Sequence, residues 1–505
     1  MTPATALIRA GQLQGALPYE RFRLPPESWA LLPGALLAEP TLALLGLWGE
    51  PGTVHAAFLD EAVGGVILCS APARDGRYAA LSPARPGASL MERAARDLWG
   101  LVAEGGTDGR PWLDHGRWVF DAPLSAGPVR RSAPPPQPEF LPVAGEGVHQ
   151  VSLGPVRDGV AEPAHLRFHV RGETVLRLEA RLGYAHKGTI GLMLGKTPRT
   201  AARFAARLSG DSTVAHGWAF ALAAEAATDA VPPPRATVLR AVMAELERVA
   251  NHLRDWGNTC AAAGFPWLEG RCGLLREMLL RACAEAFGHR LMMERVIPGG
   301  VAADLDVAGD AAIRQAVAAV AAALPGLVAV FEGHAGLADR LGGTGVVSPE
   351  LAARFAAGGV VGRASGRGMD ARAVLPLAPY GEVSVPVLTA GDAAARLRVR
   401  IAELRESLRL LPELLDALPP GEVAVPLPSP PRGRAGEGVG IVESFRGEVL
   451  HWIALDETGL LRAAFPRDPS WLHWPLLEAA MAGGSVADFA LCAASINPSC
   501  SGVDL

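Results

Sequence analysis

The chain is 505 residues long, which is enough for two or three domains. Hydrophobic residues make up 50% and charged residues 20%, so large cores are possible and global disorder is excluded. The formal net charge of −5 gives no electrostatic case for nucleic-acid binding, which requires a basic surface.

Residues 1–127 predict a small α+β domain. Strand-like runs occur at 41–49, 64–70 and 77–84, and apolar residues recur at helical spacing in 89–105. The first residues, MTPATALIRAGQLQG, lack a basic segment followed by an apolar run, so no secretory signal is expected.

Residues 128–142, PVRRSAPPPQPEFLP, predict a stiff and exposed linker. Three consecutive prolines can join neither a β-ladder nor a helix interior, because proline has no N–H and a fixed φ. Limited proteolysis is therefore expected to cut here first and to leave two fragments that stay associated through 92–118. First cleavage elsewhere, with this segment protected, would contradict the boundary.

Residues 143–505 predict a second, large and mainly helical domain with β segments at both ends. Alternating apolar and polar residues at 148–154 and 165–183 predict hairpin strands. Long helices are expected at 396–418 and at 232–258, where prolines open the helix and Gly-Asn closes it. After 439 the pattern returns to strand, followed by a helix and an irregular end.

One apolar stretch is a candidate membrane span, and the cysteines are candidate metal ligands. The stretch at 315–331 is short, rich in alanine and interrupted by Pro325, which favours a buried helix over a membrane span. The six cysteines form no CxxC pair, so neither a zinc site nor a cluster-binding loop is visible.

The only two lysines, Lys187 and Lys196, fall in GYAHKGTIGLMLGKTP, where a turn between a strand and a helix presents His186. Four segments follow one another in the order in which they occur in a known protein family. They are GYAHKGTIGLMLGKTP, RLSGDSTVAHGWAFALAAE, GEGVGIVESFRGEVLHWIALD and SINPSCSGVDL. Together they resemble the large subunit shared by complex I (49-kDa type) and energy-converting (group 4) [NiFe] hydrogenases, such as formate hydrogenlyase. Residues 92–118 resemble the signature of the complex I 30-kDa subunit. The resemblance implies a [NiFe]-hydrogenase-large-subunit-like fold for 143–505.

The resemblance also bears on nickel. Family hydrogenases hold nickel and iron with four cysteine thiolates, because a soft anionic sulfur is the ligand that these metals need. The matching positions here are Ser209, Ser212, Ser499 and Gly502, so no [NiFe] centre and no hydrogenase activity are expected. Cys500 falls between ligand positions and is interpreted as a small core residue. The sequence also stops after this motif, without the cleavable extension of many hydrogenase precursors.

In the complex I relatives, a histidine and a tyrosine offer protons to a quinone. His186 matches that histidine and is the candidate catalytic residue, whereas Gly210 falls at the tyrosine and Ala262 at the acidic partner. A two-proton mechanism then needs another donor, for which Asp211 and His216 are the candidates. The alternative for His216 is a structural hydrogen bond to a backbone carbonyl.

Five further charged residues complete the set of candidates. Arg207 opens the degenerate motif, and the resemblance implies that it faces a neighbouring subunit's iron–sulfur cluster and raises its potential. Lys187 is the second residue expected near a cofactor. Glu92, Arg93 and Asp97 match signature positions that are expected to dock the N-terminal domain rather than to catalyse.

The resemblance implies a peripheral subunit on the cytoplasmic face of the bacterial inner membrane, in a complex I-like or hydrogenase-4-like oxidoreductase. The implied partners are a small subunit with a [4Fe–4S] cluster, ferredoxin-type subunits and antiporter-like membrane subunits, and not nucleic acid. Two functions stay open. The chain forms a site for quinone or another redox carrier, as in NADH:quinone oxidoreductases, or it is a non-catalytic structural and coupling subunit.

Overall fold

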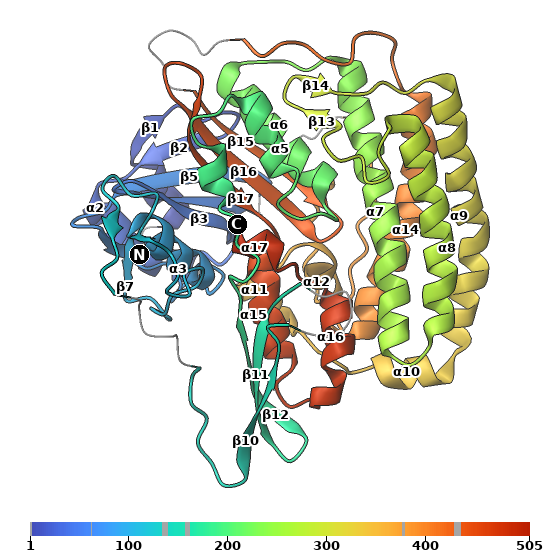
Figure 1. Cartoon of the computed structure of the whole chain (residues 1–505), viewed down its shortest axis with the longest axis horizontal. Coiled ribbons are helices and arrows are strands. Elements are labelled where there is room, and N and C mark those ends of the chain that lie inside the picture. Colours follow the sequence, from blue (N-terminus) through green and yellow to red (C-terminus); the bar gives the residue numbers. More distant parts are fainter. Residues whose placement is uncertain (1–2, 62, 134–139, 157–161, 376–378, 429–435) are drawn as a thin grey trace.

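The computed structural model describes residues 3–61, 63–133, 140–156, 162–375, 379–428 and 436–505. The protein is a mixed α/β structure in which an N-terminal sheet, a central sheet and a bundle of long helices lie side by side (Figure 1). The central sheet separates the N-terminal part from the bundle, and a long hairpin projects from the junction.

The N-terminal part is built on a mixed five-stranded sheet in the order β1-β2-β5-β4-β3, with β2 and β5 parallel. The predicted strands at 41–49 and 64–70 are confirmed, and the helix predicted at 89–105 ends at Trp99 because β7 follows it. The neighbouring strand β4 has no alternating pattern, because both of its faces are buried. The bounds are α1 (Ala4–Arg9), β1 (Gln12–Gln14), β2 (Glu20–Arg23), α2 (Pro26–Ala38), β3 (Leu42–Glu50), β4 (Thr53–Asp60), β5 (Gly65–Pro72), β6 (Arg77–Ala79), α3 (Ala88–Trp99), β7 (Val102–Glu104), β8 (Phe120–Asp121) and β9 (Val129–Arg130).

The N-terminal sheet packs directly on the central sheet. Every residue of β3 is buried, and the Trp48 ring lies 5.2 Å from Phe465 and 5.4 Å from Trp452, centroid to centroid. The two parts therefore share one hydrophobic core. Of the predicted linker, 134–139 lies outside the described residues, and β9 pairs with β8. The linker and domain boundaries stay a prediction.

The predicted hairpin strands are confirmed as an antiparallel three-stranded sheet, β10-β11-β12. This sheet extends away from the body in Figure 1 and leads into the loop at 182–188. The bounds are β10 (Val148–Leu153), β11 (His165–Arg171), β12 (Thr174–Arg181) and the following helix α4 (Thr189–Met193).

The central sheet is antiparallel in the order β15-β16-β17, and helix α6 crosses it. Glycine permits this close approach, because a Cβ at Gly440 would lie 2.0 Å from the carbonyl oxygen of Ala219. The strands expected after 439 are confirmed, but strand β17 was not predicted. The prediction of an irregular end is wrong, because short helices form the end of the chain. The bounds are α6 (Thr213–Thr228), β15 (Glu437–Ser444), β16 (Gly447–Leu455), β17 (Leu461–Arg467), α15 (Ser470–Ala480), the 3-10 helix η1 (Val486–Asp488), α16 (Phe489–Ile496) and α17 (Ser501–Asp504).

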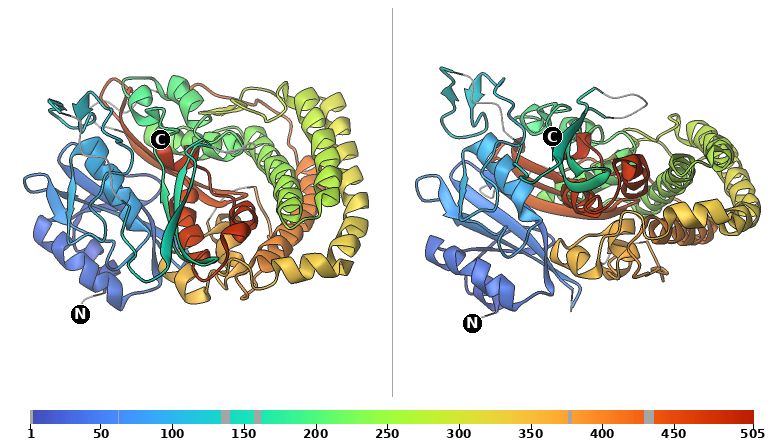
Figure 2. Two further views of the ribbon diagram at one scale, coloured as in Figure 1. Left: turned by 60° about the horizontal axis from the view of Figure 1, so that its bottom comes forward. Right: turned by 90° about the horizontal axis from the view of Figure 1, so that it is seen from below.

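Four long helices, α7, α8, α9 and α14, form the bundle, which both views of Figure 2 show as a curved layer. Helix α7 was expected to end at 257–258 but continues to Ala262. Gly257 serves packing instead, because a Cβ there would lie 2.8 Å from the Cα of Glu269 on α8. The bounds of the remaining elements are α5 (Pro198–Ala205), α7 (Pro234–Ala262), α8 (Pro266–Phe287), β13 (Val296–Ile297), β14 (Gly300–Val301), α9 (Val307–Gly333), α10 (Ala335–Leu341), α11 (Pro349–Arg354), α12 (Gly359–Ala364), α13 (Ala371–Val374) and α14 (Ala393–Asp416).

Helix α9 contains the apolar stretch expected to be a buried helix. Among the described residues it is the one helix long and apolar enough to cross a membrane, and less than half of its apolar stretch is buried. Ile313, Val317, Val320 and Leu324 are spaced so that they form one face, which packs in the bundle core. The prediction of a buried helix is thus confirmed for one face of α9 and not for the other.

Candidate functional site

The candidate catalytic residue His186 lies in the loop between β12 and α4. Its Nδ1 is 2.6 Å from the backbone carbonyl oxygen of Asp504. Because a carbonyl only accepts, Nδ1 carries the proton and donates it. Nε2 has no hydrogen-bond partner among the described residues, and it is not shut off from solvent. In the neutral ring, Nε2 is therefore the atom left to accept a hydrogen bond from a ligand.

The last two residues hold the His186 loop in place. The Asp504 carboxyl accepts the N–H of Gly183 at 2.7 Å and that of Ala185 at 2.8 Å. The carbonyl oxygen of Leu505 accepts the N–H of Lys187 at 3.1 Å. Burial raises the pKa of Asp504 to about 7, although the two N–H groups act in the opposite direction. Sequence patterns do not predict this role, and the only signal is a carboxylate two positions after the degenerate second motif.

His186 faces a cavity of about 490 Å³. The Trp118 ring, from the N-terminal part, packs against the imidazole with the centroids 4.9 Å apart. Burial lowers the pKa of His186, and the hydrogen bond to Asp504 offsets only part of that effect. The ring is therefore neutral at neutral pH. The apolar side chains on the cavity wall are Leu98, Trp118, Val119, Phe120, Leu124, Ile190 and Leu505.

The segment that carries Trp118 is positioned by α3. The Asp97 carboxylate accepts the N–H groups of residues 112 and 113 at 2.7 and 2.8 Å, and Arg93 donates to the carbonyls of 110 and 111, at 2.8 Å each. Glu92 accepts two N–H groups of its own domain, at 81 and 82. The ordered segment then contacts the body, where Nε2 of His115 lies 2.6 Å from the Leu182 carbonyl. Arg93 and Asp97 thus hold the segment that contacts the body, whereas Glu92 binds only residues 81 and 82.

Three of the four positions matched to nickel ligands come together in space. The hydroxyl oxygens of Ser209 and Ser499 are 3.2 Å apart, and the N–H of Gly502 donates to the Ser499 hydroxyl at 3.0 Å. The fourth, Ser212, is fully buried with its hydroxyl 3.5 Å from Nη1 of Arg446. Cys500 is buried beside them, in accord with a core role.

These residues do not fit a nickel ion. Hydroxyls replace thiolates, and the guanidinium groups of Arg446 and Arg254 lie 2.6 and 3.0 Å from Asp211, so positive charge already occupies the site. A Cβ at Gly502 would lie 2.7 Å from Cγ of Asp468, which leaves no room for a fourth sulfur. The described residues contain no group of three or more His, Cys, Asp or Glu that could hold a metal.

The purified protein is therefore expected to contain no stoichiometric nickel. Elemental analysis of the assembled complex checks this directly. Restoring cysteine at Ser209, Ser212, Ser499 and Gly502 together is not expected to restore binding, because Asp468 blocks the last position. About one nickel per chain in the natural protein, or hydrogen–deuterium exchange activity, would contradict the expectation.

The two alternative proton donors lie away from the His186 cavity. Burial would raise the pKa of Asp211, but Arg446 and Arg254 outweigh it and hold the pKa well below its usual range, so Asp211 stays an anion. His216 is fully buried, with Nε2 3.0 Å from the Asp468 carboxylate and Nδ1 3.0 Å from Nε2 of His451. Ser209, Asp211 and Ser212 do not contribute to the wall of that cavity. The N-terminal part supplies that wall instead.

The two basic candidates are differently placed. Lys187 lines the His186 cavity and donates from Nζ to the Leu208 carbonyl at 2.8 Å. Arg207 lies at the surface after α5 and forms an ion pair with Glu294. Because the Arg207 side chain is exposed, its guanidinium remains accessible to a neighbouring subunit despite this ion pair.

Comparison with known proteins finds similar subunits in NADH dehydrogenases and in formate hydrogenlyase. The family model described as the respiratory-chain NADH dehydrogenase 49 Kd subunit matches residues 272–434. The chain is 29% identical to formate hydrogenlyase subunit 5 of Escherichia coli (strain K12), over 83% of this chain and 76% of the relative. It is 28% identical to NADH-quinone oxidoreductase subunit 4 of Thermus thermophilus, over 71% of this chain and 94% of the relative.

The chain is thus similar, over most of its length, to subunits of NADH dehydrogenase and of formate hydrogenlyase. A solved structure of an archaeal respiratory membrane complex, the membrane-bound sulfane sulfur reductase, shares the fold with a TM-score of 0.66. That alignment covers 71% of this chain and 99% of the other at 24% identity. At the positions matched to the metal ligands of hydrogenases, the present chain has hydroxyls and glycine.

Proposed function

We propose that this large subunit belongs to a complex I-like or hydrogenase-4-like respiratory membrane complex, and that its His186 cavity binds a quinone or another flat redox carrier. The observation that carries the proposal is a neutral imidazole, fixed through Nδ1 and accessible at Nε2, in an aromatic and apolar cavity. Such a wall suits the ring of a quinone, and one polar atom suits its oxygen.

The fixed tautomer determines what His186 contributes. In the neutral form, Nε2 accepts a hydrogen bond from a hydroxyl of the reduced carrier. In the protonated form, it donates to a carbonyl oxygen, which becomes more basic as the carrier is reduced. Because burial lowers the pKa of His186, the proton passes readily to the carrier. The Trp118 ring and the Asp504 carbonyl keep the imidazole in this orientation.

The finer assignment of partners belongs to the same proposal. A small subunit with a [4Fe–4S] cluster would face Arg207 and Lys187, ferredoxin-type subunits would supply electrons, and antiporter-like membrane subunits would lie on the membrane side. The complex would sit on the cytoplasmic face of the bacterial inner membrane. The exposed Arg207 and the cavity-lining Lys187 support the contact with the cluster-bearing subunit.

A non-catalytic structural and coupling subunit is the second candidate. The observation in its favour is that the former metal position is filled by hydrogen-bonded hydroxyls and by the Asp211–Arg446 ion pair, so the ancestral centre has become packed core. The two candidates differ in whether anything binds beside His186.

A photoreactive quinone analogue tests the proposal in the assembled complex. Label is expected in the peptides that contain 117–124 and 186–191, and excess unlabelled quinone should remove it. Because α9 exposes apolar side chains but does not line the cavity, its peptide is the internal control for non-specific labelling. Label at α9 equal to that at the cavity, or no competition, would favour the structural candidate.

A further inference from the structure

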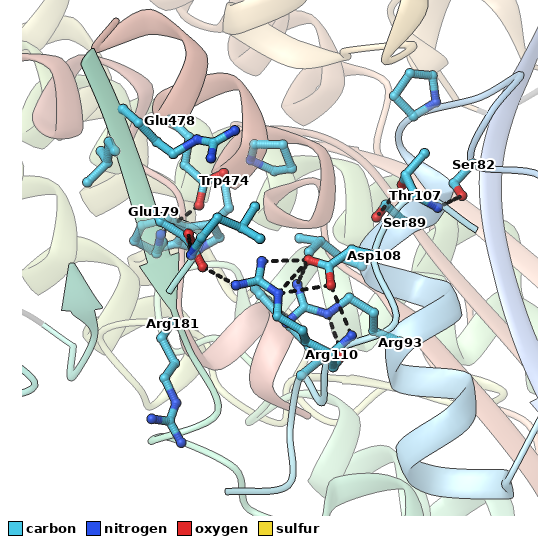
Figure 3. A pocket seen from close by; sticks show the side chains of 18 of the residues that line it. Ser82, Ser89, Arg93, Thr107, Asp108, Arg110, Glu179, Arg181, Trp474 and Glu478 are labelled. Carbon is cyan, nitrogen blue, oxygen red and sulfur yellow. Dashed lines mark hydrogen bonds and ion pairs between the residues drawn. The ribbon is translucent and has the colours of Figure 1, made fainter. Parts of the chain in front are cut away.

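A second cavity, of about 420 Å³, lies between the N-terminal part and the body (Figure 3). Its wall comes from α3 and the segment at 107–112 on one side, and from β12, the end of α11 and α15 on the other. We propose that it binds a small ligand with a phosphate or carboxylate head and a flat apolar body. The residues that carry this proposal are separate from the His186 cavity, so this proposal and the proposed function can be tested independently.

The cavity wall contains five arginines and three carboxylates. Two of the carboxylates are already neutralised. Asp108 pairs with Arg110 at 2.7 Å and with Arg93 at 3.2 Å, and Glu179 also pairs with Arg110. Figure 3 shows Asp108 between these two arginines, with Glu179 joined to Arg110, whereas no dashed line reaches Arg181. The paired groups use only two of the five arginines.

The other three arginines, Arg177, Arg181 and Arg354, form no ion pair within the part of the chain that the structure describes. Arg177 and Arg181 alternate with Glu179 along one face of β12. Nε of Arg181 is inaccessible to solvent and lacks a hydrogen-bond partner, which is a rare and costly state for a donor. The cavity thus holds unpaired positive charge, and the exposed guanidinium groups of Arg177 and Arg354 are its accessible donors for an oxyanion.

The remaining carboxylate, Glu478, opposes this charge only weakly. Its Oε1 accepts the N–H of Ala180 at 2.6 Å, and it takes part in no salt bridge among the described residues. Burial raises the pKa of Glu478 to about 7, so near neutral pH a large fraction is protonated. The field inside the cavity therefore favours an anion.

Aromatic side chains form another part of the wall. Trp112, Phe355 and Trp474 line the cavity, and Nε1 of Trp474 already donates to the Ser499 carbonyl at 3.0 Å. Both tryptophans are buried, so the half-buried Phe140 and Phe355 present the accessible aromatic surface. Arginine forks match planar or tetrahedral oxyanions, and aromatic faces match flat rings. An oxyanion without such a body would leave the aromatic wall in contact with water.

Isothermal titration calorimetry of the full-length protein tests this with three matched probes. These are 1-naphthyl phosphate, inorganic phosphate for the head alone and 1-naphthol for the body alone. We expect saturable binding of 1-naphthyl phosphate, and a Kd at least about tenfold higher for either half. Vesicles of phosphatidylglycerol, tested by co-sedimentation, distinguish a lipid source of the same chemistry from a soluble one.

Arg177→Gln and Arg354→Gln replace exposed side chains and leave the fold intact, and each should raise the Kd of 1-naphthyl phosphate about tenfold. Glu478→Gln should lower it, because a negative charge is removed. Arg405→Gln, on the exposed face of α14, is the matched control and should change nothing. Absence of saturable binding, equal binding of inorganic phosphate, or unchanged Kd values in both cavity arginine variants would overturn the proposal.

Discussion

His186→Gln is expected to lower quinone-dependent turnover of the assembled complex by about two orders of magnitude, the usual scale for losing a general acid. Glutamine keeps a side-chain donor of similar size for the Asp504 carbonyl, so the loop at 182–188 should hold its shape. What it removes is the titratable nitrogen. Steady-state turnover with a soluble quinone measures the effect.

The pH dependence gives this prediction a second readout. A protonated imidazole donates to the oxidised carrier, so turnover should rise as pH falls through the pKa of His186, which lies below the ordinary value of 6.5. The glutamine variant should lose this dependence. His149→Gln, at an exposed position on β10, is the control and should behave like the natural protein. Unchanged turnover of a fully assembled His186→Gln complex would reject the carrier site and favour the structural subunit.

Arg363→Met is expected to lower the free energy of unfolding by about 3–5 kcal/mol, because removing one partner of a buried ion pair leaves uncompensated charge. The guanidinium of Arg363 is fully buried, with Nε 2.7 Å from Glu403 and Nη1 3.0 Å from Glu443 and 3.3 Å from Asp370. Methionine has a similar length and fills the space without the charge. Urea unfolding followed by circular dichroism measures the loss.

Three further variants isolate the electrostatic cause. Arg405→Met, on the exposed face of α14, should change stability by no more than about 0.5 kcal/mol. Arg363→Met combined with Glu403→Gln should be more stable than the sum of the single effects, because the unpaired charge is removed. Burial raises the pKa of Glu443 to about 8, so Glu443→Gln should cost much less than Arg363→Met at pH 7. A loss below about 1 kcal/mol for Arg363→Met would contradict this account.

The long periodic elements were predictable, because burial on one face leaves a pattern in the sequence. The helix predicted at 396–418 is α14 (Ala393–Asp416), and the alternating segments are β10 to β12. Prediction failed where burial had no such period. Strand β4 is buried on both faces, and Gly257 was read as a helix end because the close approach of α8 has no local signal.

For the site, the sequence by itself determined that the thiolate ligands are absent, because donor atoms are a property of residue identity. It also placed His186 at a turn between a strand and a helix. Only the tertiary structure decided which segments surround that turn. Trp118 and the carbonyl of Asp504 come from distant parts of the chain, and packing of the N-terminal segment and the last helix brings them to the imidazole.

Ionisation was likewise decided by the tertiary structure alone. From the sequence, Asp211 and His216 were candidate proton donors beside the degenerate motif. In the folded chain, Arg446 and Arg254 keep Asp211 an anion, and His216 is buried between Asp468 and His451. A side chain's pKa depends on the charges and solvent within a few ångströms of it, and those neighbours are supplied by residues far away in the sequence.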